Sequence, residues 1–175
     1  MLIPHKNTAD MAGFGLIELM IVIAIIAIVS GLAAPSFSTM LANGRVRTGA
    51  DGIISGLQLA RTEAIHRNSN TTFTLNTGTG WTVAAVRPAS TVQIRPASEA
   101  GSNLQVTSLN NQLSLSFTSL GAIAGYNTGT TLTKITIAPP IGVANADSLQ
   151  IDVTAGGQIR MCNLAITTDN DPRKC

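Results

Sequence analysis

The hydrophobic pattern of this chain is dominated by one apolar run near its start. From Phe14 to Ala34 it holds about 21 residues, among which Glu18 is the only charged one. As a helix that rises ~1.5 Å per residue, this run is ~30 Å long, which matches the hydrocarbon core of a bilayer. The pattern predicts a membrane-spanning helix over residues 14–34 with one carboxylate near its beginning.

Helical periodicity resumes after Pro35, which is expected to bend the helix because its nitrogen has no hydrogen to donate. The apolar positions that share one helix face are Ile53, Leu57, Ala60 and Ala64, with Ile54 and Ile65 beside them. Arg61, Glu63 and Arg67 are expected on the opposite, polar side. Residues 35–70 are therefore predicted to form an amphipathic helix with one buried face.

The helix is expected to end at residues 68–70, after which polar and apolar positions alternate with a period of two. A hairpin is predicted over residues 72–83, with its turn at 77–80, and residues 121–131 are predicted to form a loop. Further strands are predicted at residues 92–95, 104–107, 113–117, 135–138, 149–153 and 159–162. Residues 71–175 should thus form mostly antiparallel sheets that cover the helix, an α+β fold.

Composition limits what such a chain does. The 175 residues leave about 140 outside the apolar run, enough for one domain with a modest core. Only 3% of residues are aromatic and 11% charged, which is typical of a β-rich domain outside the cytoplasm. The two cysteines and two histidines do not suggest a metal site, and no cofactor is expected. Without a nucleophile motif, a histidine cluster or a phosphate loop, the chain is not expected to be an enzyme.

The residues before the apolar run indicate whether processing removes the run or keeps it in the mature protein. A secretory signal peptide would be cut after the run at a small-residue site, and the chain would lose the run. A cut at Ala33-Ala34 does not suit that interpretation well, because Pro35 would follow the cut bond. The sequence GFGLIEL at 13–19 instead resembles the signal of type IV prepilins and pseudopilins. That resemblance implies that prepilin peptidase removes residues 1–13 by cutting after Gly13, that Phe14 is N-methylated, and that Glu18 becomes the fifth mature residue.

Glu18 is expected to act in assembly. A carboxylate within a membrane helix costs a few kcal/mol, and an unpaired one usually has a function. Cleavage before Phe14 creates an ammonium group that Glu18 of a neighbouring copy would neutralise as helices stack. The alternative is that Glu18, close to the new terminus, only reaches back to the membrane surface.

Four later motifs resemble the GspH/FimT family of minor pilins and pseudopilins. They are GLQLARTEAI at 56–65, WTV at 81–83, FTSLG at 117–121 and GQIRMC at 157–162. The resemblance implies a helix packed on two antiparallel sheets, with other pilin subunits as partners. It also implies a single-pass inner-membrane protein with its globular domain in the periplasm, a minor type IV pilin of the FimT type that takes part in pilus assembly and priming. The alternative is a GspH-like pseudopilin of a type II secretion system.

Cys162 and Cys175 are the only cysteines. In a domain outside the cytoplasm they most simply form one disulfide, which closes a loop of about 14 residues. In the chain-entropy model, such a loop stabilises the fold by roughly 3 kcal/mol.

A candidate contact with double-stranded DNA lies on this loop. Members that resemble FimT and take part in natural transformation are associated with a C-terminal Gly-Arg-x-Arg motif that contacts DNA. The corresponding residues here are 157–160, in which Arg160 is kept but Gln158 replaces the first arginine. Arg173 and Lys174 would add two charges if the disulfide brings them to Arg160.

Asp169 and Asp171 oppose that positive charge. Three cations would neutralise about three phosphates, which gives weak and salt-sensitive binding. The alternative interpretation is that these cations are solvated charges near the disulfide.

Overall fold

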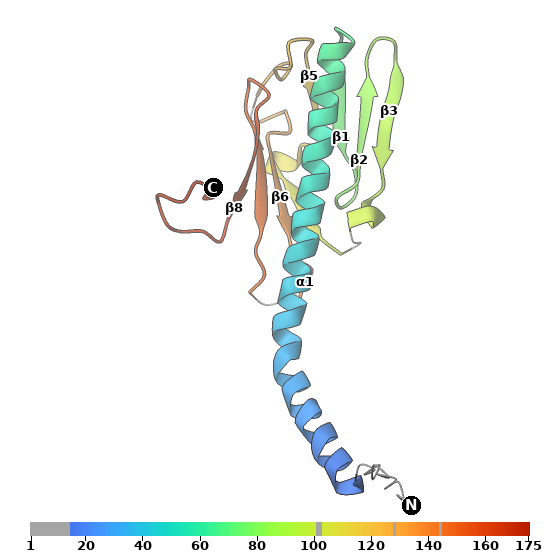
Figure 1. Cartoon of the computed structure of the whole chain (residues 1–175). Helices are drawn as coiled ribbons and strands as arrows, with labels where there is room; N and C mark the ends of the chain where they lie inside the picture. Colours follow the sequence, from blue (N-terminus) through green and yellow to red (C-terminus); the bar gives the residue numbers. More distant parts are fainter. Residues whose placement is uncertain (1–14, 101–102, 128, 144) are drawn as a thin grey trace, which may run out of the picture. The chain divides into compact units, whose positions relative to one another are not determined.

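The computed structural model describes residues 15–100, 103–127, 129–143 and 145–175, without the side chains of residues 33–35 and 100 (Figure 1). The chain divides into two compact units, Met1–Phe37 and Ser38–Cys175, which are described one by one. The predicted leader, Gly13 and Phe14 lie outside the described residues, and so does the side chain of Pro35.

The first unit contains the beginning of helix α1, which spans Leu16–His66. All residues at 16–32 are exposed, and most are large and apolar. Among the described residues, no single helix meets the length and hydropathy required of a membrane span, whereas Leu16–Leu32 and Ser36–His66 meet them as a pair. A helix segment that is apolar on every side needs lipid or other helices around it.

The rest of α1 lies in the second unit and has one fully buried face. As predicted, Ile53, Leu57, Ala60 and Ala64 are on it, joined by Ala42, Val46 and Ala50. The prediction for Ile65 is wrong, because its side chain is 50% exposed. Arg61, predicted on the solvent side, is partly buried and donates from Nε to the carbonyl oxygen of Gly121 at 3.1 Å.

Helix α1 ends at His66, two to four residues before the end predicted at residues 68–70. Asn68 then adopts the left-handed conformation with φ 49°, and Ser69 N donates back to Ala64 O at 3.1 Å. A left-handed asparagine just past the last turn is a common way to end a helix, because it lets the chain satisfy the final carbonyls.

Two four-stranded antiparallel sheets follow (Figure 1). The described strands are β1 Thr71–Leu75, β2 Trp81–Ala85, β3 Ser90–Arg95, β4 Gln105–Ser108, β5 Ser114–Phe117, β6 Lys134–Ala138, β7 Leu149–Val153 and β8 Ile159–Asn163. One sheet has the order β3-β2-β1-β5 and the other β4-β6-β7-β8. The predicted α+β class is confirmed, and the predicted strands differ from the observed ones by at most two residues at an end.

One core joins the helix to both sheets. Alternate residues of β1, β2 and β7 are buried, as expected for strands with one face on a core. The first sheet approaches the helix closely at Gly56, where an added Cβ would lie 2.6 Å from Trp81. Trp81 Nε1 also donates to Gly52 O at 2.9 Å, so the indole fixes the sheet against the helix.

Candidate assembly helix and disulfide loop

Glu18 lies in the first turn of α1 and is exposed, like the apolar residues around it. In the part of the chain that the structure describes, it makes no ion pair. Its predicted partner is the terminal ammonium of another copy, so the role of Glu18 stays a prediction. What the structure adds is the setting, an exposed apolar helix segment with this single carboxylate.

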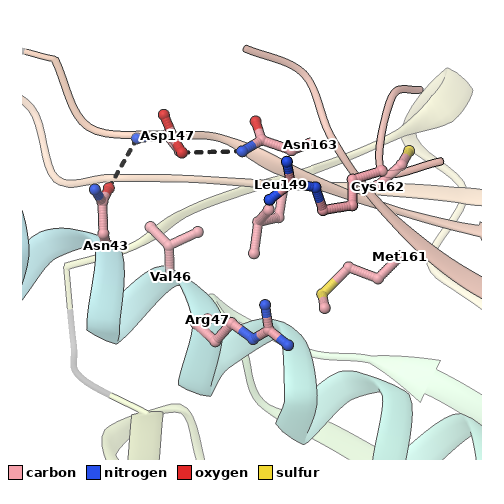
Figure 2. Close-up of a pocket in the computed structure, with 9 residues that line it drawn as sticks. Asn43, Val46, Arg47, Asp147, Leu149, Met161, Cys162 and Asn163 are labelled. Atoms are coloured by element: carbon pink, nitrogen blue, oxygen red, sulfur yellow. Dashed lines mark hydrogen bonds between the residues drawn. The ribbon is translucent and has the colours of Figure 1, made fainter. Parts of the chain in front are cut away.

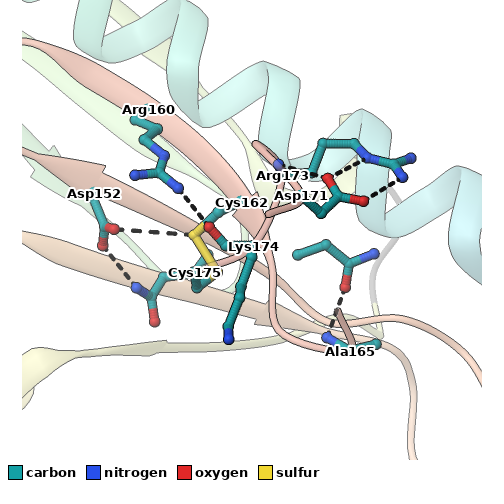
Figure 3. Close-up of a disulfide and its surroundings, with 10 residues drawn as sticks. Asp152, Arg160, Cys162, Ala165, Asp171, Arg173, Lys174 and Cys175 are labelled. Atoms are coloured by element: carbon teal, nitrogen blue, oxygen red, sulfur yellow. Dashed lines mark hydrogen bonds and ion pairs between the residues drawn. A yellow bond between two sulfur atoms is a disulfide. The ribbon is translucent and has the colours of Figure 1, made fainter. Parts of the chain in front are cut away.

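Cys162 and Cys175 form a disulfide with their Cα atoms 5.1 Å apart (Figure 3). Cys162 lies on β8 and is only 2% exposed. The tail segment, defined here as residues 164–175, returns alongside β8, where Asn163 N donates to Arg173 O at 2.7 Å. The disulfide therefore brings Arg173 and Lys174 to the strand that carries Arg160. This placement was the condition for these two residues to add to the positive charge of Arg160.

Arg173 and Lys174 are paired with the aspartates of their own loop: Arg173 with Asp171 (Figure 3) and Lys174 with Asp169. Arg173 donates from Nε and Nη2 to the two carboxylate oxygens of Asp171, at 3.0 and 2.8 Å. These hydrogen bonds lower the pKa of Asp171 from 3.8 to about 2 and raise the pKa of Arg173. Lys174 Nζ contacts the carboxylate of Asp169 and donates to Thr167 O at 3.2 Å.

Arg160 differs from the other two cations. Its Nη2 donates to the backbone oxygen of Lys174, and among the described residues it has no carboxylate within ion-pair distance. It stands opposite Asp152 of β7, which in turn stands opposite Lys134 of β6. Lys134 and Arg160 therefore share the outer face of the second sheet, on either side of Asp152. We did not single out Lys134 from the sequence, although the period-two pattern of both strands contained the signal.

Gly157, the first residue of the candidate DNA motif, has a structural role. Its φ is +75°, and an added Cβ would lie 1.9 Å from the carbonyl oxygen of Gly121. The same carbonyl accepts the hydrogen bond from Arg61. The motif glycine is thus required where the β7–β8 turn meets the helix and the loop after β5.

A cavity of about 270 Å³ lies between the helix and the last two strands (Figure 2). Asn43 Oδ1 accepts a hydrogen bond from Asp147 N at 2.8 Å, and Asp147 Oδ2 accepts one from Asn163 Nδ2 at 2.9 Å. Val46, Leu149 and Met161 add apolar surface, and Arg47, Cys162 and Arg173 complete the lining. The sequence did not reveal this site, because Asn43 and Asp147 are 104 residues apart.

A helix on two antiparallel sheets, continuous in sequence with an exposed apolar segment, defines a subunit of the type IV pilin class. The chain belongs to the family described as type II transport protein GspH, whose model matches residues 49–157. Residues 9–34 match the prokaryotic N-terminal methylation motif. The chain is therefore a minor type IV pilin or pseudopilin, a protein that is membrane-anchored by its N-terminal segment and assembles with other pilin subunits.

Solved structures support the fold. Two crystal structures of the type IV minor pilin FimU from Pseudomonas aeruginosa match with TM-scores of 0.50 and 0.52, each at 16% sequence identity. The matches cover 66% of this chain and 90% and 87% of those chains. A comparison with curated proteins finds no match.

Proposed function

We propose that this chain is a FimT-type minor pilin that helps to prime and assemble a type IV pilus. Prepilin peptidase cuts after Gly13, Phe14 becomes the methylated N-terminus, and the anchor places the globular domain in the periplasm. The observation that carries the proposal is the exposed apolar segment at 16–32, whose only charge is Glu18. Such a segment suits both lipid and a bundle of similar helices.

Glu18 favours the placement of this segment in a bundle of pilin helices over its placement in lipid. In lipid the charge of Glu18 costs a few kcal/mol, whereas the ammonium of Phe14 on a neighbouring copy would neutralise it. Opposite charges attract much more strongly in an apolar surrounding than in water. Assembly would therefore remove the free-energy cost of the unpaired Glu18 charge in lipid.

Substitution of Glu18 tests the proposal. Glu18→Ala should leave processing and membrane insertion intact but lower incorporation into pili at least about tenfold, since a loss of ~1.4 kcal/mol already has that effect. Immunoblots of sheared pili and of membranes measure the two pools. Leu19→Ala, one position away and equally exposed, is the matched control and should assemble normally.

Undiminished incorporation of the Glu18→Ala chain would contradict the pairing argument. A Gly13→Ala chain in the same assay should stay about 13 residues longer than the mature protein, and its normal maturation would contradict the assigned cut site.

DNA binding is the second candidate function, favoured by Arg160, whose guanidinium has no carboxylate partner among the described residues. Arg173 and Lys174 are already neutralised, so we expect contact with only one or two phosphates, through Arg160 and Lys134. The proposal predicts weak binding. Removal of Arg160 should reduce the slope of log affinity against log salt concentration by about 1.

The test measures binding of double-stranded DNA to the full chain in neutral detergent across a salt series. Arg160→Gln should weaken binding, whereas Arg87→Gln, an equal charge change at an exposed position in the turn between β2 and β3, should not. Equal effects of the two substitutions, or no binding at low salt, would remove this candidate. Pilus assembly would then remain, with the GspH-like pseudopilin of type II secretion as its alternative, which neighbouring genes would distinguish.

A further inference from the structure

The outer edge of β8 is closed at one end only. β8 is the last strand of its sheet, and in an antiparallel ladder alternate residues turn their backbone groups away from the partner strand. Asn163 N, which bonds to the tail segment, points outward. The N–H and C=O groups of Ile159 and Met161, at two-residue steps from Asn163, therefore point outward as well.

The tail segment closes the Asn163 end of this edge. Asn163 and Lys174 form a parallel β-bridge, Arg160 holds the Lys174 carbonyl, and the disulfide ties the tail segment to Cys162 (Figure 3). Ile159 and Met161 have no backbone partner on that side among the described residues. Two residues are too short a stretch to pair with a foreign strand, since strands seldom have fewer than about three residues.

The other sheet has an open edge at β3. This strand pairs with β2 alone in the described part of the chain, and most of its residues are exposed on both faces. Ile94 stands opposite Thr82, which bonds toward β1, so the backbone groups of Ile94 face the open side. The Ile94 side chain is 62% exposed, and Ser90, Thr91 and Gln93 carry no charge that would repel another strand.

We propose that the β8 edge is a strand-pairing surface for β3 of a second copy, and that the disulfide-held tail segment keeps it closed. With the tail segment released, the five residues of β8 would offer an edge of similar length to the six of β3. The tail segment itself shows that this edge accepts an extended chain, through the bridge at Asn163. Because the two edges differ, the contact is head-to-tail and extends an assembly instead of closing a dimer.

The disulfide decides between the two states. It holds the tail segment near β8 by closing a loop over a sequence separation of 13. In the chain-entropy model a loop of this size favours the closed form by roughly 100-fold over the reduced chain. A copy whose disulfide has not formed therefore exposes the edge, and oxidation removes it.

Photo-cross-linking of the full chain in detergent micelles tests the proposal. p-Benzoylphenylalanine replaces Ser90, an exposed residue at the start of β3, and mass spectrometry identifies its adducts with and without a reductant. Reduction acts on this bond alone, since Cys162 and Cys175 are the only cysteines. We expect copy-to-copy adducts with residues 159–163 to increase at least about tenfold on reduction.

Ile94→Pro removes one outward N–H of β3 and should abolish that increase, while Ile94→Thr, which keeps the N–H, should preserve it. Association through the apolar helix segment would be the same before and after reduction, so it does not mimic the result.

Resistance to proteolysis shows whether the reduced chain keeps its fold. If it does not, an Asp169→Ala/Asp171→Ala chain loosens the tail segment with the disulfide intact and should give a smaller increase of the same adducts. No increase in a folded chain, or one that Ile94→Pro leaves unchanged, would overturn the proposal.

Discussion

At the scale of single residues, the charges of the tail segment are arranged to satisfy one another. Arg173 donates hydrogen bonds to both carboxylate oxygens of Asp171, while Lys174 contacts Asp169. The sequence showed that the aspartates oppose the cations, but not that each cation would have its own partner. Partner choice depends on how the disulfide folds the loop, which residue spacing does not reveal. Of the three cations predicted to contact DNA, Arg160 is the one without a carboxylate partner among the described residues.

The Asp171–Arg173 pair predicts a pH dependence of the tail segment. The pKa of Asp171 is about 2 in the folded chain, below its ordinary value of 3.8, because the charged form accepts hydrogen bonds from the side chain and the backbone N–H of Arg173. A folded-state pKa below the unfolded value means that the pair stabilises the loop above about pH 4 and that this contribution is lost as the pH falls through 2. A carboxyl NMR titration should place the pKa of Asp171 near 2 and should find it higher in Arg173→Gln, which loses the guanidinium but keeps the backbone N–H of residue 173 as a donor. Titration of Asp171 near 4 in the unaltered chain would contradict the pairing.

At the scale of elements, the sequence predicts what is local. The bounds of β7, Leu149–Val153, agree with its alternating pattern because one face of that strand is buried along its whole length. Arg61 was expected on the solvent side but is partly buried, because it donates to the Gly121 carbonyl in the loop after β5. Helical periodicity contains no information on that loop. The cavity around Asn43 and Asp147 was missed for the same reason.

The turn between β7 and β8 provides a test of such a non-local junction. Gly157→Ala would place a methyl group 1.9 Å from the Gly121 carbonyl at a φ of +75°, so the junction must shift. We expect a loss of about 1–3 kcal/mol in the free energy of unfolding. Gly156→Ala is the matched control, because an added Cβ there meets nothing within 4 Å. Thermal unfolding, monitored by circular dichroism, compares the two variants. Equal midpoints would show that the turn accommodates the methyl group without loss of stability.

At the scale of the whole molecule, the chain combines two units with opposite requirements. The described part of the unit Met1–Phe37 exposes its apolar side chains at residues 16–32, whereas the buried apolar residues of Ser38–Cys175 lie between Ala42 and Cys162. Among the residues of the first unit whose side chains are described, none is buried. A stable fold needs only the residues that bury its apolar surface, together with the disulfide that ties down its last strand.

A fragment that begins at Ser38 should accordingly fold by itself in water, without detergent. We expect one cooperative thermal transition, within a few degrees of the transition of the full chain's globular unit, because each buried side chain keeps its neighbours. Size-exclusion chromatography should show a monomer when the disulfide is formed, since the apolar residues of the anchor have been removed. A fragment that begins at Asp51 is the informative contrast: it lacks Val46 and Ala50 of the core and Asn43 of the polar network, and should melt markedly lower. If the Ser38 fragment failed to unfold cooperatively, the anchor would have to support the globular unit, and the separation of membrane attachment from folding would be wrong.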